Sequence, residues 1–207
     1  MRTRAASSAV RTRMSDGTST FAATGSISLN GSAFFGFLSS GAAADSPHAT
    51  SPTATPSNRI RASLAGSKAE GAKFDRIEAY RTNFSGIHAQ GATFASAEMQ
   101  RSNFTDAVLI NVNFTKAELG RADFTGADIT GTKFALANLA RADFSKAKFS
   151  GPIDFANSFL YLTRIEGLDL SAATGLAQWQ IDMSCGDGNT KLPSGLTASA
   201  NWPCEFD

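Results

Sequence analysis

An apolar residue recurs at every fifth position from residue 64 to residue 149, and this spacing limits the folds that are open to the chain. We call this residue the centre of its unit, and the small or β-branched residue two places earlier the minus-two residue. A period of five fits neither an amphipathic helix, which repeats at 3.6, nor a simple strand, which repeats at two. Short extended segments joined by regular turns do fit, because centre and minus-two residue then both point inward. The pattern predicts a coiled repeat protein in which each unit forms one side of a coil.

The units resemble those of the pentapeptide-repeat family, which read Ala, Asp or Asn, Leu or Phe, and then two variable residues. Ala-Asp-Phe at 122–124 and 142–144, and Ala-Asn-Leu at 137–139, match this unit directly. The resemblance covers about half of the chain. It implies an all-β fold, a right-handed quadrilateral β-helix (a solenoid) with four units per coil, which here gives about five coils.

With four units per coil, residues 20 apart in sequence stack about 4.8 Å apart. The phenylalanine centres then form two opposite inward columns, which we expect to be the core: Phe74, Phe94, Phe114 and Phe134 in one, and Phe84, Phe104, Phe124 and Phe144 in the other. The remaining two sides carry Ala, Met, Leu and Ile centres and end with Phe149.

The same stacking predicts three polar columns at one corner of the coil. They are Arg81, Arg101, Arg121 and Arg141; Glu78, Glu98, Glu118 and Asn138; and Asn83, Asn103, Asp123 and Asp143. Arginines stacked alone at this spacing repel one another by about 1 to 3.5 kcal/mol per neighbouring pair, so flanking acids would make the column tolerable. We interpret the columns as a self-neutralising surface. The alternative is a candidate interaction ladder that recognises an acidic partner or an anion.

The register of the repeat changes after Phe149. An unchanged register would bury Asp154, Phe159, Arg164 and Asp169, whereas a shift of one residue buries Phe155, Leu160, Ile165 and Leu170. Burying three ionisable side chains is costly, so we expect the shifted register. Gly151-Pro152 is the expected position of the extra residue, since glycine and proline occur at bulges.

The repeat ends at Leu170, and we expect residues 171–207 to form a C-terminal cap. Leu176, Trp179, Ile181 and Met183 indicate a short helix within 172–184 that covers the open end of the core, with Trp179 as a lid residue. Cys185 and Cys204 flank a segment rich in turn residues, and we predict a disulfide between them. Such a bond favours an oxidising compartment.

Residues 1–60 differ in composition from the repeat, which predicts three regions: 1–60, 61–170 and 171–207. The first is rich in Ser, Ala, Thr and Arg and ends in a Pro/Ser/Thr linker at 45–58 that contains His48. An apolar run at 33–38 followed by small residues at 42–44 resembles a signal-peptide cleavage site. A retained disordered tail, or a plug formed by Phe34, Phe35 and Phe37, are the alternatives.

Charge and motifs favour a protein that is not an enzyme. The chain has 19 basic and 18 acidic residues, which implies no bulk attraction to nucleic acid or to an anionic membrane. His88 precedes a centre and should face solvent. The sequence has no Cys–His pair, phosphate-binding glycine loop, zinc ligand set or isolated carboxylate pair. We expect no catalytic residues, no cofactor and no metal.

The leading hypothesis is a structural or protein-interaction scaffold with an unidentified protein partner. One alternative follows from the resemblance, because some pentapeptide-repeat proteins imitate DNA and bind a type II topoisomerase; the 12 acidic and 12 basic residues of 62–170 disfavour it. Another alternative is an exported, envelope-associated protein. We expect a monomer or weak end-to-end dimer without a transmembrane segment, in a periplasmic or otherwise exported location rather than the cytoplasm.

Overall fold

The computed structural model describes residues 14–15, 18–19 and 63–205. Two short strands, β1 (Met14–Ser15) and β2 (Thr18–Ser19), pair antiparallel. The predicted cleavage site, the alternatives for residues 33–44 and the linker at 45–58 lie outside the described residues.

Three further elements follow the repeat. Strands β3 (Ile153–Asp154) and β4 (Ala173–Thr174) pair in parallel, and helix α1 spans Gln178–Met183. No helix in residues 63–205 is long and apolar enough to cross a membrane.

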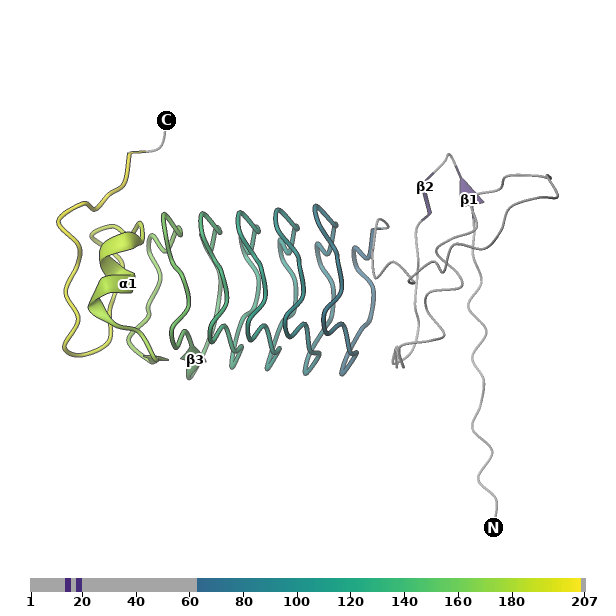
Figure 1. The fold of residues 1–207 in the computed structure, drawn as a ribbon, viewed down its shortest axis with the longest axis horizontal. Helices are drawn as coiled ribbons and strands as arrows, with labels where there is room; N and C mark the ends of the chain where they lie inside the picture. The colour runs from purple at the N-terminus through teal and green to yellow at the C-terminus, as the bar shows by residue number, and fades with distance from the viewer. Residues whose placement is uncertain (1–13, 16–17, 20–62, 206–207) are drawn as a thin grey trace, which may run out of the picture.

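The repeat forms a stack of short coils (Figure 1). Each unit from the one that contains Lys68 to the one that contains Asp128 makes an isolated parallel bridge to the unit four further along the chain, as Lys68 does to His88. The Phe84 amide donates to the Asn103 carbonyl at 2.7 Å, and the Asn103 amide donates to the Thr82 carbonyl at 3.0 Å. Four units therefore complete one coil, so the coil has four sides.

Phenylalanine rings fill the centre of the stack. The eight phenylalanines predicted for the core are at most 1% exposed. Rings within a column stack with centroids 4.6–5.4 Å apart, and rings of opposite columns meet edge to face at 5.5–6.1 Å. Both geometries are favourable for aromatic pairs, so each coil adds the same contacts to the one before it.

Hydroxyl groups at minus-two positions are buried but hydrogen-bonded. The Ser102 hydroxyl donates to the Ala79 carbonyl, and the Thr132 hydroxyl donates to the Leu109 carbonyl, both at 2.7 Å. These bonds offset the cost of burying a polar group and connect neighbouring coils.

The register shift predicted after Phe149 is confirmed. Lys148 pairs with Asp128 at the usual interval of one coil, whereas Asp154 pairs with Lys133 at an interval one residue longer. One extra residue therefore lies between positions 148 and 154. The four centres of the shifted register are each 2% exposed: Phe155, Leu160, Ile165 and Leu170.

Phe149, which the unbroken pattern places in the core, is only partly buried. Within residues 63–205, no bridge joins Lys148 to Asp169 in the next coil. The inserted residue interrupts the ladder directly after Phe149, so the next coil does not cover this side chain as it covers the other centres.

Residues 173–191 make one more turn of the stack, in which a helix replaces one side. β4 pairs with β3, Cys185 with Arg164, and Lys191 with Asp169. α1 occupies the remaining side, where Gln180 Nε2 donates to the carbonyls of Phe155 and Ser158, both at 2.9 Å.

The predictions for this helix were partly wrong. The short helix expected within 172–184 is present as α1 at Gln178–Met183, and the same range also contains strand β4. Trp179, predicted as a lid, is 47% exposed, whereas Gln180 and Ile181 are fully buried. Successive helical residues are rotated by about 100°, so a helix that buries 180 and 181 turns Trp179 outward.

The chain then returns across the end of the stack. Cys185 and Cys204 form the predicted disulfide, with their Cα atoms 5.3 Å apart. Trp202 packs against the core, and its indole Nε1 donates to the Ser184 carbonyl at 2.7 Å.

Candidate interaction face

One side of the stack carries the predicted glutamate column, and we call it the Met99 side. Its buried centres are Ala79, Met99, Leu119, Leu139 and Leu160. The residue before each centre points outward, because side chains alternate along extended backbone. This outward row is bridged from coil to coil: Glu78, Glu98, Glu118, Asn138 and Phe159.

The four arginines lie at the corner that follows the Met99 side, and we call them the arginine column. All four adopt the left-handed conformation, with φ between 55° and 61°. The amide of Arg101 donates to the Gly120 carbonyl at 2.9 Å, and that of Arg121 to the Ala140 carbonyl at 2.8 Å. Backbone hydrogen bonds therefore fix the bases of these side chains one coil apart, about 4.8 Å.

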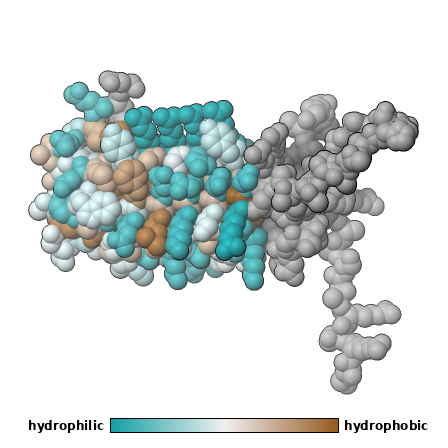
Figure 2. All heavy atoms as spheres, viewed as in Figure 1, coloured by the Kyte–Doolittle hydropathy of each residue, from teal (hydrophilic) through white to brown (hydrophobic). Residues whose placement is uncertain are grey.

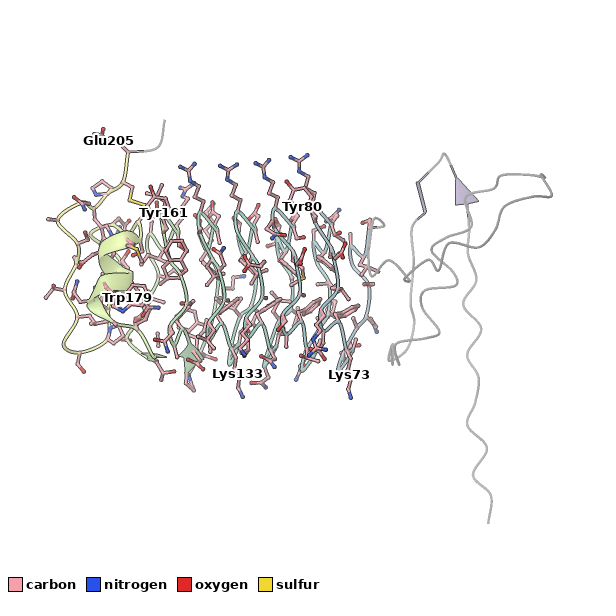
Figure 3. All side chains as sticks on the ribbon, in the orientation of Figure 1. Lys73, Tyr80, Lys133, Tyr161, Trp179 and Glu205 are labelled. Atoms are coloured by element: carbon pink, nitrogen blue, oxygen red, sulfur yellow. A yellow bond between two sulfur atoms is a disulfide. The ribbon has the colours of Figure 1, made fainter. Side chains whose placement is uncertain are left out.

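The arginine column is not neutralised by direct ion pairs, as the self-neutralising interpretation would require. In the region 63–205, none of the four arginines makes an ion pair with a carboxylate. Arg81 instead lies over the Tyr80 ring, 5.1 Å from its centroid. The guanidinium groups are exposed along this corner, and Figure 3 shows side chains tipped with nitrogen along the edge that carries Tyr80.

The flanking polar side chains have other partners. Asp123 Oδ1 accepts the Thr125 amide at 2.9 Å, and Asp143 Oδ1 accepts the Ser145 amide at 2.7 Å. Glu118 accepts a hydrogen bond from Asn138 Nδ2 at 2.8 Å. Aspartate and asparagine bond readily to an amide two residues on, and this local turn directs them away from the arginines.

An apolar cluster continues the Met99 side toward the C-terminus, and we call it the aromatic patch. It comprises Leu136, Phe159, Tyr161 and Trp179, which are 51%, 44%, 46% and 47% exposed. The rings of Phe159 and Tyr161 stack, with centroids 6.2 Å apart and planes at 13°. Figure 2 shows pale and brown residues over this end of the face and teal residues over the earlier coils.

The patch and the arginine column adjoin. The Arg141 amide donates to the Tyr161 carbonyl at 2.8 Å, so Tyr161 extends the same corner by one coil. Figure 3 shows Tyr161 and Tyr80 on one edge, with Trp179 on α1 nearby. Sequence reasoning missed this patch. The signal available was the register shift, which puts Phe159 in the outward row while Leu160 becomes the buried centre.

Outside this face, the described region has few groups of the kinds that the sequence analysis considered. No cluster of three or more His, Cys, Asp or Glu side chains that could hold a metal occurs in residues 63–205. His88 is exposed, as predicted. A shallow hollow is lined by Asp75, Arg76, Thr93 and their neighbours, and Asp75 Oδ1 already accepts hydrogen bonds from the Thr93 hydroxyl and the Ala95 amide.

These features define a β-solenoid whose coils are built from four five-residue units. The family model for pentapeptide repeats matches residues 90–126 and 117–151, with eight copies of the repeat. Residues 90–151 therefore consist of pentapeptide repeats, as the sequence predicted. Repeats of this type imply a right-handed quadrilateral β-helix. No curated protein sequence matches the chain.

Several solved structures are similar to it. Trypsin-treated QnrB1, a plasmid-mediated fluoroquinolone resistance protein, is 21% identical over 68% of this chain, with a TM-score of 0.46. The match spans 65% of that chain, slightly less than two thirds of its length. HetL, involved in regulating heterocyst differentiation in Nostoc sp. strain PCC 7120, is 15% identical over 70% of this chain and 84% of its own, with a TM-score of 0.26. A pentapeptide-repeat protein of the Arabidopsis thaliana thylakoid lumen is 23% identical over 59% and 80% of the two chains, with a TM-score of 0.25.

Proposed function

We propose that this protein is a non-catalytic scaffold that binds a protein partner through the Met99 side. The observation that carries the proposal is the aromatic patch lying directly beside the arginine column. Isolated exposed apolar residues are ordinary on a soluble protein, but a contiguous group rimmed by polar residues is typical of an interaction site. Aromatic residues and arginine are also the residue types enriched at protein interfaces and their hot spots.

The candidate ladder contributes the charged part of this proposed site: Glu78, Arg81, Glu98, Arg101, Glu118, Arg121 and Arg141. Its arginines stand on a rigid backbone, so little main-chain entropy is lost when a partner binds them. The rest of the solenoid serves to hold the face flat, because each coil repeats the backbone of the coil below it.

Imitation of a DNA duplex is disfavoured by charge. A duplex mimic presents a surplus of negative charge along the rod, whereas residues 62–170 contain 12 acidic and 12 basic residues. The arginine column would in addition repel a partner whose binding surface is adapted to phosphate.

Export to an oxidising compartment is a second part of the proposal, and the disulfide between Cys185 and Cys204 supports it. Mass spectrometry of protein alkylated during isolation from its host gives the thiol state and the mature N-terminus together. We expect an intact disulfide on a chain that begins near Asp45. Alkylated free thiols on a chain that begins near Met1 would refute export.

The partner proposal is tested by capture with three immobilised forms of the full chain. The first is unchanged, the second carries Phe159→Ser with Tyr161→Ser, and the third carries Lys73→Ala with Lys133→Ala on another side of the stack. Melting temperature and circular dichroism establish that all three fold. We expect at least one host protein to be retained by the first and third forms and lost by the second. Identical retention by all three forms would contradict the proposal.

A further inference from the structure

The Met99 side is too narrow for an ordinary interface between two globular surfaces. Three extended residues give a side roughly 10 Å wide, and six turns give a length of roughly 29 Å, or about 300 Å² of flat area. A stable protein interface buries about 800 Å² on each partner. A single secondary-structure element matches this face better than a domain or a second copy of the chain.

The spacing of the arginines distinguishes between kinds of element. Three coil steps separate Arg81 from Arg141, a span of about 14 Å. On a helix, side chains at i, i+3, i+7 and i+10 share one face and span about 15 Å. On an extended strand, four side chains on one face span about 20 Å. The helix matches the column within about 1 Å, and the strand misses it by about 6 Å.

The charges specify the sequence of such a helix. The arginine column requires acidic residues on the helix. Their stripe can be only one side chain wide, because the glutamate row lies on the same face. Glu98 and Glu118 repel negative charge next to that stripe and favour neutral or basic residues there. The rings of the aromatic patch, on Phe159, Tyr161 and Trp179, lie one to two coils beyond Arg141 and require apolar residues one to two helical turns further along.

We infer that the Met99 side binds an amphipathic helix of a partner protein, with an acidic stripe on the arginine column and apolar residues on the aromatic patch. This inference rests on the proposed function and specifies the partner's chemistry. The chain's own residues 1–62 do not fit this description, since Asp16 and Asp45 are their only acidic residues. A nucleic acid fits poorly too, because its phosphates would also face the glutamate row.

A synthetic helical peptide that is long enough to follow the whole face supplies the test. It carries Glu at i, i+3, i+7 and i+10, Lys beside this stripe, and Leu and Trp at i+14, i+17 and i+18. A peptide of the same composition with the order of the Glu residues scrambled is the matched probe. Fluorescence anisotropy with the full chain should give at least tenfold tighter binding for the ordered peptide, and the difference should shrink as salt is raised.

Two charge-reversed variants localise the binding. Arg101→Glu with Arg121→Glu should weaken binding of the ordered peptide at least tenfold, because two attractions become repulsions. Lys73→Glu with Lys133→Glu makes the same change in net charge on another side, where Figure 3 labels both lysines, and should change binding less than twofold. Equal loss in both variants, or equal binding of the ordered and scrambled peptides, would overturn the inference.

Two further measurements exclude other occupants. A DNA duplex that bound as tightly as the ordered peptide and was lost in the Arg101→Glu, Arg121→Glu variant would identify a polyanion site and overturn the helix. Sedimentation that showed a dimer abolished by the same variant would identify a second copy as the occupant. If the capture experiment retains a host protein through the patch while the two peptides bind equally, the scaffold proposal stands and the helix inference falls.

Discussion

The repeat coils and the C-terminal turn are stabilised by different kinds of contact. In the coils, the backbone ladder and the stacked phenylalanines recur once in every coil, so each contact is supplied many times. In residues 173–205 the ladder continues through β4, Cys185 and Lys191, but each side-chain contact occurs once, from Gln180, Trp202 or the disulfide. The coils are therefore stabilised by contacts that are repeated between each pair of neighbouring coils, whereas the stability of the last turn depends on individual side chains.

The largest change in stability is expected for a substitution in the middle of the core. Phe124 is fully buried and stacks on Phe104 at 5.1 Å and on Phe144 at 4.8 Å. Phe124→Ala should lower the free energy of unfolding by about 3 to 5 kcal/mol. Leu136→Ala removes an exposed apolar side chain and should change it by less than about 0.5 kcal/mol. Denaturant unfolding measures both, and a loss below about 1 kcal/mol for Phe124→Ala would mean that the coils do not depend on stacked rings.

The structure of the repeat was predictable because its five-residue pattern is short and recurs along the chain. The core columns follow from the positions of the centres. The register shift follows as well, since only one of the two registers avoids burying Asp154, Arg164 and Asp169. The break in the ladder that leaves Phe149 partly exposed could not be read from the pattern, because it depends on where the extra backbone residue is accommodated.

The candidate face was predicted only in part. The arginine column follows from the stacking of every fourth unit, but its lack of ion pairs depends on side-chain conformations, since Asp123 and Asp143 bind amides in their own turns. The aromatic patch joins residues from three separate turns, one of them on a helix whose contacts, with Phe155 and Ser158, lie far away in sequence. No short motif marks such a cluster.

Loss of the disulfide should destabilise the last turn before it affects the coils. Cys185 and Cys204 are separated by 19 positions in sequence, and a loop of this length contributes about 3 kcal/mol through the unfolded chain's entropy. Cys204→Ala should lower stability by about this amount, and hydrogen exchange should accelerate first at 173–205. The coils from 84 to 144 should keep their protection. Uniform acceleration along the whole stack would show that the last turn and the coils unfold as one unit.

Gln180 tests whether single polar side chains hold the last turn. Its amide group donates to the carbonyls of Phe155 and Ser158, and its Oε1 accepts the Ala177 amide at 2.8 Å. Gln180→Met keeps the volume but leaves these buried groups without partners, which should cost about 1 to 3 kcal/mol. Gln178→Met removes hydrogen bonds to Asp182 and Thr197 that are exposed to solvent, so water can replace them, and it should cost less than about 1 kcal/mol. Equal effects in thermal unfolding would show that burial of the Gln180 amide is unimportant.

The smallest expected effect is a response to acid confined to the end of the stack. A hydrogen bond from Lys191, followed by those from Ser171, lowers the pKa of Asp169 from 3.8 to about 2. Hydrogen bonds from the Gly167 amide, Thr190 and Asn189 lower the pKa of Asp187 as well. Both folded-state pKa values lie below their unfolded values, so the stabilisation is complete above about pH 4 and is lost as the pH falls further.

Asp169 and Asp187 are accessible to solvent, and screening keeps this contribution small. In an NMR titration, the Ser171 amide should report a midpoint near pH 2, and the Gly167 amide a midpoint below 3.8. Asp187→Asn should abolish the Gly167 response and leave that of Ser171 in place, because each amide bonds to a different carboxylate. Midpoints above 3.8 would reverse the sign, and acid would then stabilise the last turn relative to the coils instead of loosening it.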